Sequence, residues 1–471
     1  MQTRRSFIRR GVSATGAISL ARCFGTAAFG QGADAPDWQR NALGAYAYNS
    51  DLQLRSALVA HSNSEAAAVE ALAHARANGT PFAIRSSGHC FAGLSQNREM
   101  VIDLSGMNAV TPIGADRVIA QTGARLGDVY AALGPMGRVV PLGTCQNVAL
   151  GGLATGGGIG PYSRAFGLTC DTMLRARIIL ADGQIVTTSA SENPDLFWAL
   201  RGGGAANFGI LTEAEFQSFE VGEVTILRYF WEGSPEMVAR VIEAWQRRAP
   251  ALPRRMSSFL VIRSVGTQFV QVLGYLITFD DHDHARQAAL DFYDIQKPSI
   301  DPPIVFGSPD RMASDIWPRD YNPSHPRKVI SFFQTAPTPA AQWEAILQRL
   351  RADPSWNVSI VLDLMGGAID DLAPSDSAFP HRGIATMTAQ FDSALDDRAP
   401  RAAQIARLVD LTRLVQDQSA EGRAYLNYAD RDLPHYAQAY WGENLERLQE
   451  IKARYDPLNL FNGPQSIPLD R

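Results

Sequence analysis

The sequence predicts an α+β protein with two domains and a C-terminal segment, on three observations. Between residues 40 and 218, short strand-like runs alternate with short helices, and glycine-rich loops connect them. From residue 219 to 424 the glycine clusters cease, and longer strand-like runs alternate with helices, which is typical of an antiparallel sheet covered by helices on one side. Residues 425–471 contain one further helix and an Asp-Pro-Leu-Asn stop.

Composition narrows the class of protein. The chain has 471 residues, 46% of them hydrophobic, which is enough for two or three domain-sized cores. Its net charge of −5 offers no basic field to a nucleic acid, so we expect no such partner. No stretch beyond the N-terminal region is both long and apolar enough to span a bilayer, so we expect no membrane span in the mature chain.

The first 33 residues have the features of an export signal. Thr3, Arg4, Arg5, Ser6, Phe7 and Ile8 precede an apolar run of small residues, which is the pattern of the twin-arginine (Tat) route. We expect cleavage between residues 28 and 33 and a periplasmic or secreted bacterial protein. Because the Tat machinery exports folded proteins, this signal also favours a protein that acquires its prosthetic group in the cytoplasm.

Capping residues place the elements of the first domain. Ser64 begins a helix over residues 65–77 that Gly79 ends, and a strand follows at residues 81–85. Strands are predicted at 101–104 and 118–121 and a helix at 126–133. The Ala-Asp-Gly turn between runs 175–180 and 184–188 predicts a β-hairpin. Asn193 and Pro194 then begin a helix that reaches residue 200.

The later elements follow from longer patterns. We expect strands at residues 269–278 and 358–364. We expect helices at residues 340–351 and 401–415, and a last helix at 444–455.

Two glycine-rich loops carry the most informative residues. His89 lies in RSSGHCFAG (residues 85–93), directly after the predicted strand, and Cys145 lies in the loop of residues 141–160. An imidazole and a thiolate are the nucleophiles suited to the two neighbouring electrophilic positions of an isoalloxazine ring, so the pair indicates a flavin held by two side chains. The chain has neither a strand-GxGxxG-helix unit nor a GxxxxGK[ST] loop, which argues against a Rossmann site and against phosphoryl transfer.

The cysteines fit this interpretation. Removal of the signal leaves Cys90, Cys145 and Cys170, an odd number, so at least one is unpaired. A thioether to the flavin would account for Cys145 and leave Cys90 and Cys170 either reduced or joined. No metal is expected, because His89 and Cys90 are adjacent and no CxxC or HxxxH spacing occurs.

With these motifs, the chain resembles the berberine-bridge-enzyme-like branch of the vanillyl-alcohol-oxidase, or PCMH-type, flavoprotein superfamily. The resemblance implies FAD linked through His89 to the flavin 8α-methyl group and through Cys145 to flavin C6. It implies a PCMH-type FAD-binding domain at residues 40–218, a substrate-binding domain at 219–424, and a segment from 425 that returns to the FAD domain. The implied cofactor-binding residues are His89, Cys145, Arg85, Ser86, Ser87, Gly88, Gly151, Gly152, Gly156, Gly157, Gly209 and Asn462.

Three positions depart from the family pattern. Ser87 and Ala149 stand where glycines are usual, and Gln146 stands where proline is common. None of these departures removes an atom that would link to the flavin.

The resemblance also implies the catalytic groups. The segment AYLNYAD (residues 424–430) is similar to the family's Y-x-N-Y segment, which makes Tyr428 the expected base near flavin N5 and Tyr425 the second choice. A phenol titrates near pH 10, so it needs a charged or hydrogen-bonding neighbour to act as a base. Asp363 and Arg382 lie in segments that resemble pocket-lining strands of the family.

The resulting hypothesis is an FAD-linked oxidase that transfers a hydride from a CH–OH carbon of a sugar, an oligosaccharide or a glycosylated or secondary alcohol to flavin. Molecular oxygen is the expected acceptor, giving hydrogen peroxide, and Val148, three positions after the linking cysteine, is similar to what oxidases of the family carry. Two alternatives remain: a dehydrogenase that passes electrons to a quinone or a protein, and a non-catalytic flavin-binding protein.

Overall fold

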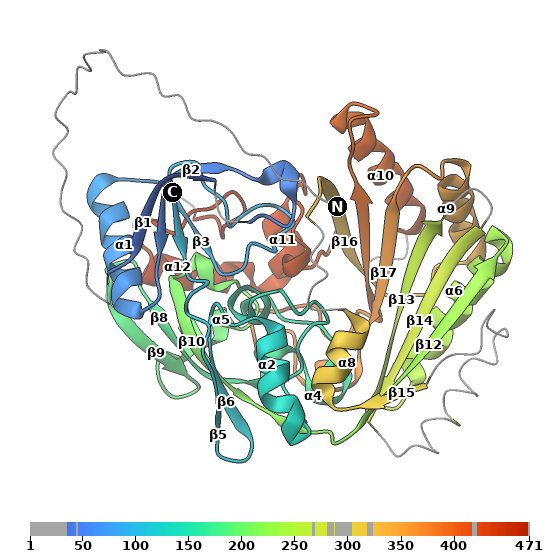
Figure 1. Cartoon of the computed structure of the whole chain (residues 1–471), viewed down its shortest axis with the longest axis horizontal. Coiled ribbons are helices and arrows are strands. Elements are labelled where there is room, and N and C mark those ends of the chain that lie inside the picture. The colour runs from blue at the N-terminus through green and yellow to red at the C-terminus, as the bar shows by residue number, and fades with distance from the viewer. Residues whose placement is uncertain are drawn as a thin grey trace, which may run out of the picture.

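The computed structural model describes residues 35–43, 46–265, 269–279, 287, 304–317, 324–416 and 422–469. Two lobes lie side by side, the first built from the N-terminal half of the chain and the second from one long twisted sheet (Figure 1). The predicted export signal, residues 1–33, lies outside the described residues. In the described part of the chain, no helix combines the length and the apolar character needed to cross a membrane.

The first lobe begins with a small mixed sheet. Its strand order is β1 (Asp37–Leu43), β2 (Arg55–His61), β4 (Met100–Asp103) and β3 (Phe82–Arg85). Helix α1 (Glu65–Asn78) crosses between β2 and β3, which permits the parallel pairing of both strands with β4. As predicted, the Ser64 side chain accepts a hydrogen bond from the Ala67 amide, and Gly79 ends α1 with a φ of 59°.

A second sheet completes the first lobe. Its antiparallel order is β5 (Val110–Ile113), β6 (Arg117–Gln121), β10 (Ile210–Gln217), β8 (Met173–Ile179) and β9 (Ile185–Ser189). The predicted hairpin is confirmed, because β8 pairs with β9. Further elements of this lobe are α2 (Leu126–Leu133), β7 (Arg138–Val139), α3 (Leu150–Thr155), α4 (Ser163–Phe166), α5 (Pro194–Leu200) and β11 (Phe219–Glu220).

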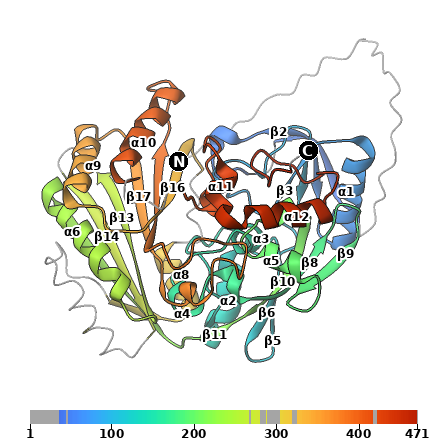
Figure 2. The ribbon, with the colours of Figure 1, turned by 180° about the vertical axis from the view of Figure 1, so that it is seen from behind.

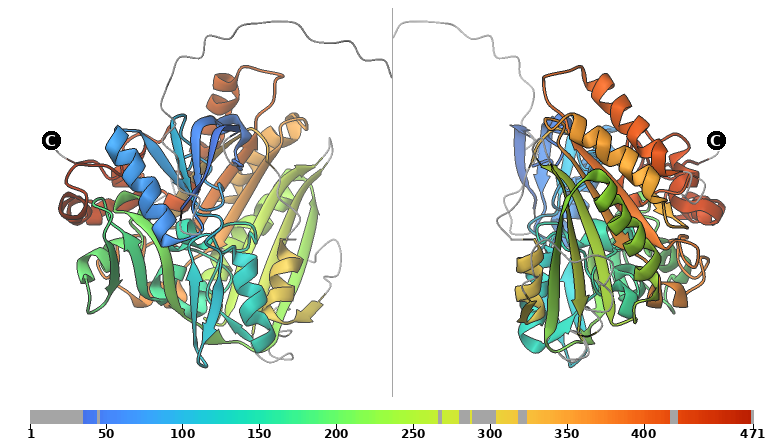
Figure 3. Two further views of the ribbon diagram at one scale, coloured as in Figure 1. Left: turned by 60° about the vertical axis from the view of Figure 1, so that its left-hand side comes forward. Right: turned by 90° about the vertical axis from the view of Figure 1, so that its right-hand side faces the viewer.

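The second lobe is an antiparallel sheet with helices on one face, as the sequence predicts. Its order is β15 (Ile304–Gly307), β12 (Val224–Gly233), β14 (Phe269–Thr278), β13 (Met256–Val265), β17 (Val358–Leu364), β18 (Met387–Ala394) and β16 (Arg327–Gln334). Helices α6 (Pro235–Arg248), α9 (Ala340–Ala352) and α10 (Arg401–Gln416) cover its outer face (Figure 3). Helix α8 (Pro309–Ile316) lies between β15 and the first lobe.

Side-chain alternation along β17 decides which residue reaches the inner face. Leu362 and Leu364 are buried in the core between the sheet and its helices. Because successive side chains of a strand point to opposite faces, Asp363 points away from that core and toward the first lobe. The single polar residue at this end of β17 is thereby directed between the lobes.

The C-terminal segment packs against the first lobe. Its helices are α11 (Tyr436–Trp441) and α12 (Leu445–Tyr455), which lie beside α3 and α5 at the back of the molecule (Figure 2). Lys452, fully buried, donates to the carbonyl oxygens of Asn207 at 2.8 Å and Phe461 at 3.0 Å and to the Asp456 carboxylate at 3.0 Å. This buried cluster fastens the last helix to the first lobe.

Replacement of Lys452 tests how much this buried cluster stabilises the protein. Lys452→Met would leave the buried Asp456 carboxylate without its cation, and we expect the free energy of unfolding to fall by about 3 to 5 kcal/mol. Urea unfolding of the purified protein measures the change. The control is Arg454→Met on the same helix. Arg454 forms an exposed ion pair with Asp195, which should contribute about 1 kcal/mol or less to the free energy of unfolding. Equal effects of the two variants would contradict a special role for the buried cluster.

Candidate functional site

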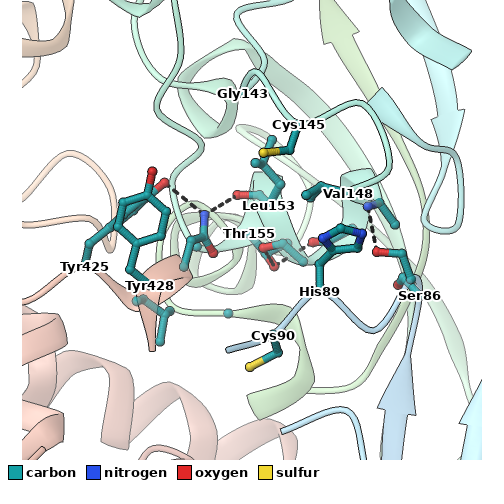
Figure 4. A pocket seen from close by; sticks show the side chains of 18 of the residues that line it. Ser86, His89, Cys90, Gly143, Cys145, Val148, Leu153, Thr155, Tyr425 and Tyr428 are labelled. Carbon is teal, nitrogen blue, oxygen red and sulfur yellow. Dashed lines mark hydrogen bonds between the residues drawn. The ribbon is translucent and has the colours of Figure 1, made fainter. Parts of the chain in front are cut away.

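A cavity of about 380 Å³ lies where the two lobes and the C-terminal segment meet. The first lobe contributes both glycine-rich loops, the second lobe contributes β13 and β17, and the C-terminal segment contributes Tyr425 to Tyr428. Figure 4 shows the two tyrosines on one side of this cavity, and His89 and Cys145 on other parts of its wall. His89 and Cys145, the two residues that the sequence predicts to hold a flavin, therefore line the same cavity.

His89 is held in its uncharged form. Burial, together with the positive charges of Arg125, Arg327 and Arg85, lowers the pKa of the His89 imidazole to about 4. The ring is therefore neutral at physiological pH and keeps a nucleophilic nitrogen. Burial also raises the pKa of the Cys145 thiol to about 11, so this thiol is protonated at neutral pH. Reaction at Cys145 thus requires removal of a proton.

Two glycines of the cavity wall fit a ligand that approaches the backbone closely. Gly152 and Gly463 both line the cavity, and a Cβ atom added at either would meet no protein atom within 4 Å. Neither has a positive φ, so protein geometry does not require glycine at these positions. A flat, extended ligand such as FAD, seated on this wall, would use the space that a side chain would fill.

Most of the predicted cofactor-binding residues line the cavity. They are Ser86, Ser87, Gly88, His89, Cys145, Gly151, Gly152, Gly156 and Gly209. Gly157 lies beside this wall without contributing to it. Asn462 is exposed, and its neighbour Gly463 takes the wall position. Arg85 is also behind the wall, where its guanidinium donates to Asp103 at 2.6 Å and thereby holds the end of β3.

The departures from the family pattern have structural roles. The Ala149 amide donates to the Ser87 hydroxyl at 2.9 Å, so the two residues that replace glycines bind the two loops to each other. The Gln146 amide donates to the Trp317 carbonyl at 2.8 Å and to the Ser314 hydroxyl at 3.2 Å. The Cys145 loop is thereby fixed to the second lobe near α8.

Tyr428 and Asp363 meet in the cavity. The Tyr428 hydroxyl donates to Asp363 Oδ2 at 3.3 Å, and the Thr388 hydroxyl donates to the same oxygen at 3.4 Å. Burial raises the pKa of Asp363 to about 6, against the lowering effect of these two hydrogen bonds. Burial and the Asp363 charge raise the pKa of Tyr428 well above its usual value. The pair at neutral pH is therefore a phenol beside a carboxylate.

Tyr425 has a different environment. Its hydroxyl oxygen accepts hydrogen bonds from the amides of Gly158 at 2.9 Å and Ile159 at 3.1 Å and from the Asn427 side chain at 2.9 Å. Asn427 also donates to the Leu153 carbonyl at 3.0 Å, which fixes the orientation of its amide. Tyr425 thus holds the glycine-rich loop, and Tyr428 is the tyrosine with a carboxylate partner.

The expectation that Arg382 belongs to the lining of the pocket is wrong. It does not line the cavity; its fully buried guanidinium forms a two-pronged ion pair with Asp171 and donates to the Ile369 carbonyl and the Ser377 hydroxyl. The sequence could not reveal this partner, because Asp171 lies 211 residues away along the chain. Arg382 has the environment of a residue that joins the lobes.

The cysteines of the described residues are unbonded to one another. Cys90 lines the cavity and Cys170 is buried elsewhere, and Cys90, Cys145 and Cys170 are all free thiols. Among the described residues, no group of three His, Cys, Asp or Glu side chains is placed to hold a metal ion.

Comparison with known proteins decides the family. Residues 56–189 match the FAD binding domain family model, and residues 424–468 match the model described as "Berberine and berberine like". An FAD-linked oxidoreductase from Bacillus subtilis, named YgaK and uncharacterised, is 32% identical over 419 residues, which cover 85% of this chain and 88% of that protein. The chain belongs to the berberine bridge enzyme-like family.

Two further similar proteins support this family assignment. A chitooligosaccharide oxidase from Gibberella zeae is 28% identical, with 89% of each chain covered. The solved structure of BBE-like 1 from Physcomitrella patens superposes with a TM-score of 0.82 at 26% identity, covering 93% of this chain and 97% of that one. The protein is therefore an FAD-linked oxidoreductase with the two-part α+β fold of this family.

The role of Tyr425 as a loop anchor can be tested. Tyr425→Phe would leave the buried amides of Gly158 and Ile159 without an acceptor, so we expect a loss of about 1 to 3 kcal/mol in stability. Denaturant unfolding measures it, with Tyr436→Phe as a control that removes a single hydroxyl donor to the Ser466 carbonyl. If Tyr425→Phe cost no more than this control, the anchor assignment would be wrong.

Proposed function

We propose that the protein is an oxidase that removes a hydride from a CH–OH carbon of an alcohol and passes the electrons to molecular oxygen, giving hydrogen peroxide. The substrate class is a sugar, an oligosaccharide or a glycosylated or secondary alcohol. The observation that carries the proposal is the Tyr428 and Asp363 pair, which faces the same cavity as His89 and Cys145.

His89 and Cys145 are the residues proposed to bind the cofactor covalently, with the glycine-rich loops enclosing the rest of it. FAD, when bound, supplies the isoalloxazine ring that accepts the hydride. The neutral imidazole of His89 supports attachment at this residue, because only the uncharged ring has a free electron pair on nitrogen. For the protonated Cys145 thiol, the attachment includes loss of a proton.

The tyrosine and the aspartate are proposed to share one proton-transfer step. The raised pKa of Tyr428 means that its resting form is the phenol, which cannot accept a proton alone. As the Tyr428 oxygen takes the proton of the substrate hydroxyl, Asp363 takes the phenolic proton along the existing hydrogen bond. The oxygen left on the substrate carbon then drives the hydride away from that carbon.

The charge of the cavity supports a neutral substrate. Beside Tyr428, a substrate carboxylate or phosphate would lie against the Asp363 carboxylate. Asp363 would repel such a group. The name of the Gibberella zeae relative, a chitooligosaccharide oxidase, is consistent with a carbohydrate alcohol.

Two further proposals concern the acceptor and the location. Val148 lines the cavity three positions after Cys145, where the family resemblance associates valine with reaction with oxygen. The alternative acceptor is a quinone or a protein. We also propose export by the Tat machinery to the periplasm or medium, which the twin arginines at residues 4 and 5 support.

Covalent attachment is tested by two single variants and their combination. His89→Ala and Cys145→Ala should each keep FAD attached through the remaining residue, because either bond alone survives acid precipitation. The double variant should release all of its flavin. Intact mass spectrometry of the washed protein measures attachment, and unmodified wild-type protein would contradict the proposal.

The proton-transfer step predicts a pH profile. Asp363 must be ionised to accept a proton, so the rate of flavin reduction should rise as pH increases through about 6 and be constant above it. Asp363→Asn and Tyr428→Phe should each lower this rate by about 100-fold or more and remove the step near pH 6. Anaerobic stopped-flow absorbance with a substrate sugar or alcohol measures the rate.

Thr388→Val is the matched control for that profile. It removes one hydrogen bond to the Asp363 carboxylate, which should raise the pKa of Asp363. The rate of flavin reduction should then rise at a higher pH, while the rate at high pH changes little. A Tyr428→Phe variant that reduces flavin at the wild-type rate would exclude Tyr428 as the base. Oxygen consumption with peroxide formation distinguishes the oxidase from the dehydrogenase alternative.

A further inference from the structure

A continuous stack of rings and charges lies behind His89. The Tyr48 ring is stacked on the His89 imidazole, with centroids 4.6 Å apart and planes inclined by 24°. On Tyr48 lies the guanidinium of Arg327, whose Cζ atom is 4.0 Å from the ring centroid. Tyr48 and Arg327 are 7% and 4% exposed, so the stack is an interior feature.

Arg327 and Tyr48 are each fixed by other contacts. Arg327 donates to Asp392 Oδ2 at 2.7 Å and contacts His325 Nδ1 at 2.9 Å. The Tyr48 amide donates to the carbonyl of Gly88, the residue before His89, at 2.9 Å. The orientation of Tyr48 is therefore set from the His89 loop and from the second lobe together.

The stack crosses the boundary between the lobes. His89 and Tyr48 belong to the first lobe, whereas Arg327 and Asp392 belong to β16 and β18 of the second. Asn49 reinforces this crossing, because its side chain donates to the Arg327 carbonyl at 3.0 Å and accepts from the Arg327 amide at 3.2 Å. A change in the position of β16 would thus move the aromatic surface on which the imidazole rests.

We propose that Tyr48, held by Arg327, is a positioning residue that fixes the plane of the His89 imidazole for attachment to the flavin. A nucleophile reacts fastest when its attacking atom is held in one orientation, and the stack removes the freedom of the ring to rotate. The ring contacts of Tyr48 include the His89 imidazole, whereas Cys145 is coupled to the stack through the charge of Arg327, so loss of the Tyr48 ring should act mainly on the His89 linkage. The inference rests on the covalent attachment proposed above.

Attachment of His89 to the flavin methyl group is an oxidation, so it requires one two-electron oxidant. Bond formation between an imidazole nitrogen and the flavin methyl carbon breaks one C–H bond and the imidazole N–H bond. The two electrons and two protons so released would leave with the oxidising power of the bound flavin, and molecular oxygen would finally take them as hydrogen peroxide. Tyr48 and Arg327 take no part in this transfer.

The test compares two substitutions of Tyr48. Tyr48→Leu keeps an apolar side chain but removes the ring, and we expect the ratio of His89-linked to His89-free chains to fall about tenfold, from the loss of the aromatic and cation–π contacts. Tyr48→Phe keeps the ring and should retain the wild-type ratio within about twofold. Peptide mass spectrometry of the purified holoprotein reads the His89 linkage, with the Cys145 linkage in the same sample as internal reference.

Arg401→Met is the matched control. It breaks the 3.2 Å ion pair between Arg401 and Asp51, which joins the same N-terminal segment to the second lobe without touching the stack. Its His89 linkage should equal that of the wild type. If Arg401→Met lowered the linkage as much as Tyr48→Leu, a general weakening of the lobe boundary would explain both and the inference would be wrong.

A second variant keeps the test decisive if Tyr48→Leu fails to fold. The double variant Arg327→Gln with Asp392→Asn retains hydrogen-bonding groups but removes the cation from the Tyr48 ring, and it should lower the His89 linkage about threefold. A wild-type ratio in this variant or in folded Tyr48→Leu would overturn the inference. Wild-type protein without His89 linkage would instead overturn the proposed covalent attachment itself, and this inference with it.

Discussion

The hydrogen bond between Tyr428 and Asp363 joins the two parts of the chain on which the proposed chemistry depends. Tyr428 belongs to the C-terminal segment that packs on the first lobe, and Asp363 belongs to the sheet of the second lobe. The bond forms in a buried cavity, where a carboxylate is poorly solvated and its proton affinity is raised. Burial thereby converts an ordinary aspartate into a group that can exchange a proton near neutral pH.

The rest of the fold can be understood as support for that contact. Lys452 and Asp456 fasten the C-terminal segment to the first lobe, and the Lys328 side chain binds Asp430, two residues after Tyr428. Lys328 lies on β16, the same strand whose Arg327 holds Tyr48 against His89. One edge strand of the second lobe therefore sets the position of the proposed base and of the proposed flavin-linking histidine. A displacement of this strand would disturb both at once.

Much of this structure could be predicted from the sequence, where local signals exist. The caps Ser64 and Gly79 bound a helix as expected, because capping depends on residues only a few positions apart. The strand of residues 358–364 was predictable from its alternating pattern, and that alternation also directs Asp363 inward. His89 and Cys145, each in a recognisable loop, do reach one cavity.

The main error and the main omission concern long-range pairs, whereas Asn462 was misplaced by a single position beside Gly463. Arg382 was expected in the cavity and instead pairs with Asp171, while the stack of Tyr48 on His89 and of Arg327 on Tyr48 has no sequence signal at all. Such contacts depend on how the lobes meet, which no local pattern encodes.

A tryptic peptide map shows whether a single flavin bridges the His89 and Cys145 loops. Cleavage after arginine gives peptide 86–98, which contains His89, and peptide 139–164, which contains Cys145. Attachment at both residues should give one yellow species whose mass is that of both peptides joined through one FAD-derived group. Recovery of the two peptides as separate, unmodified species would contradict it.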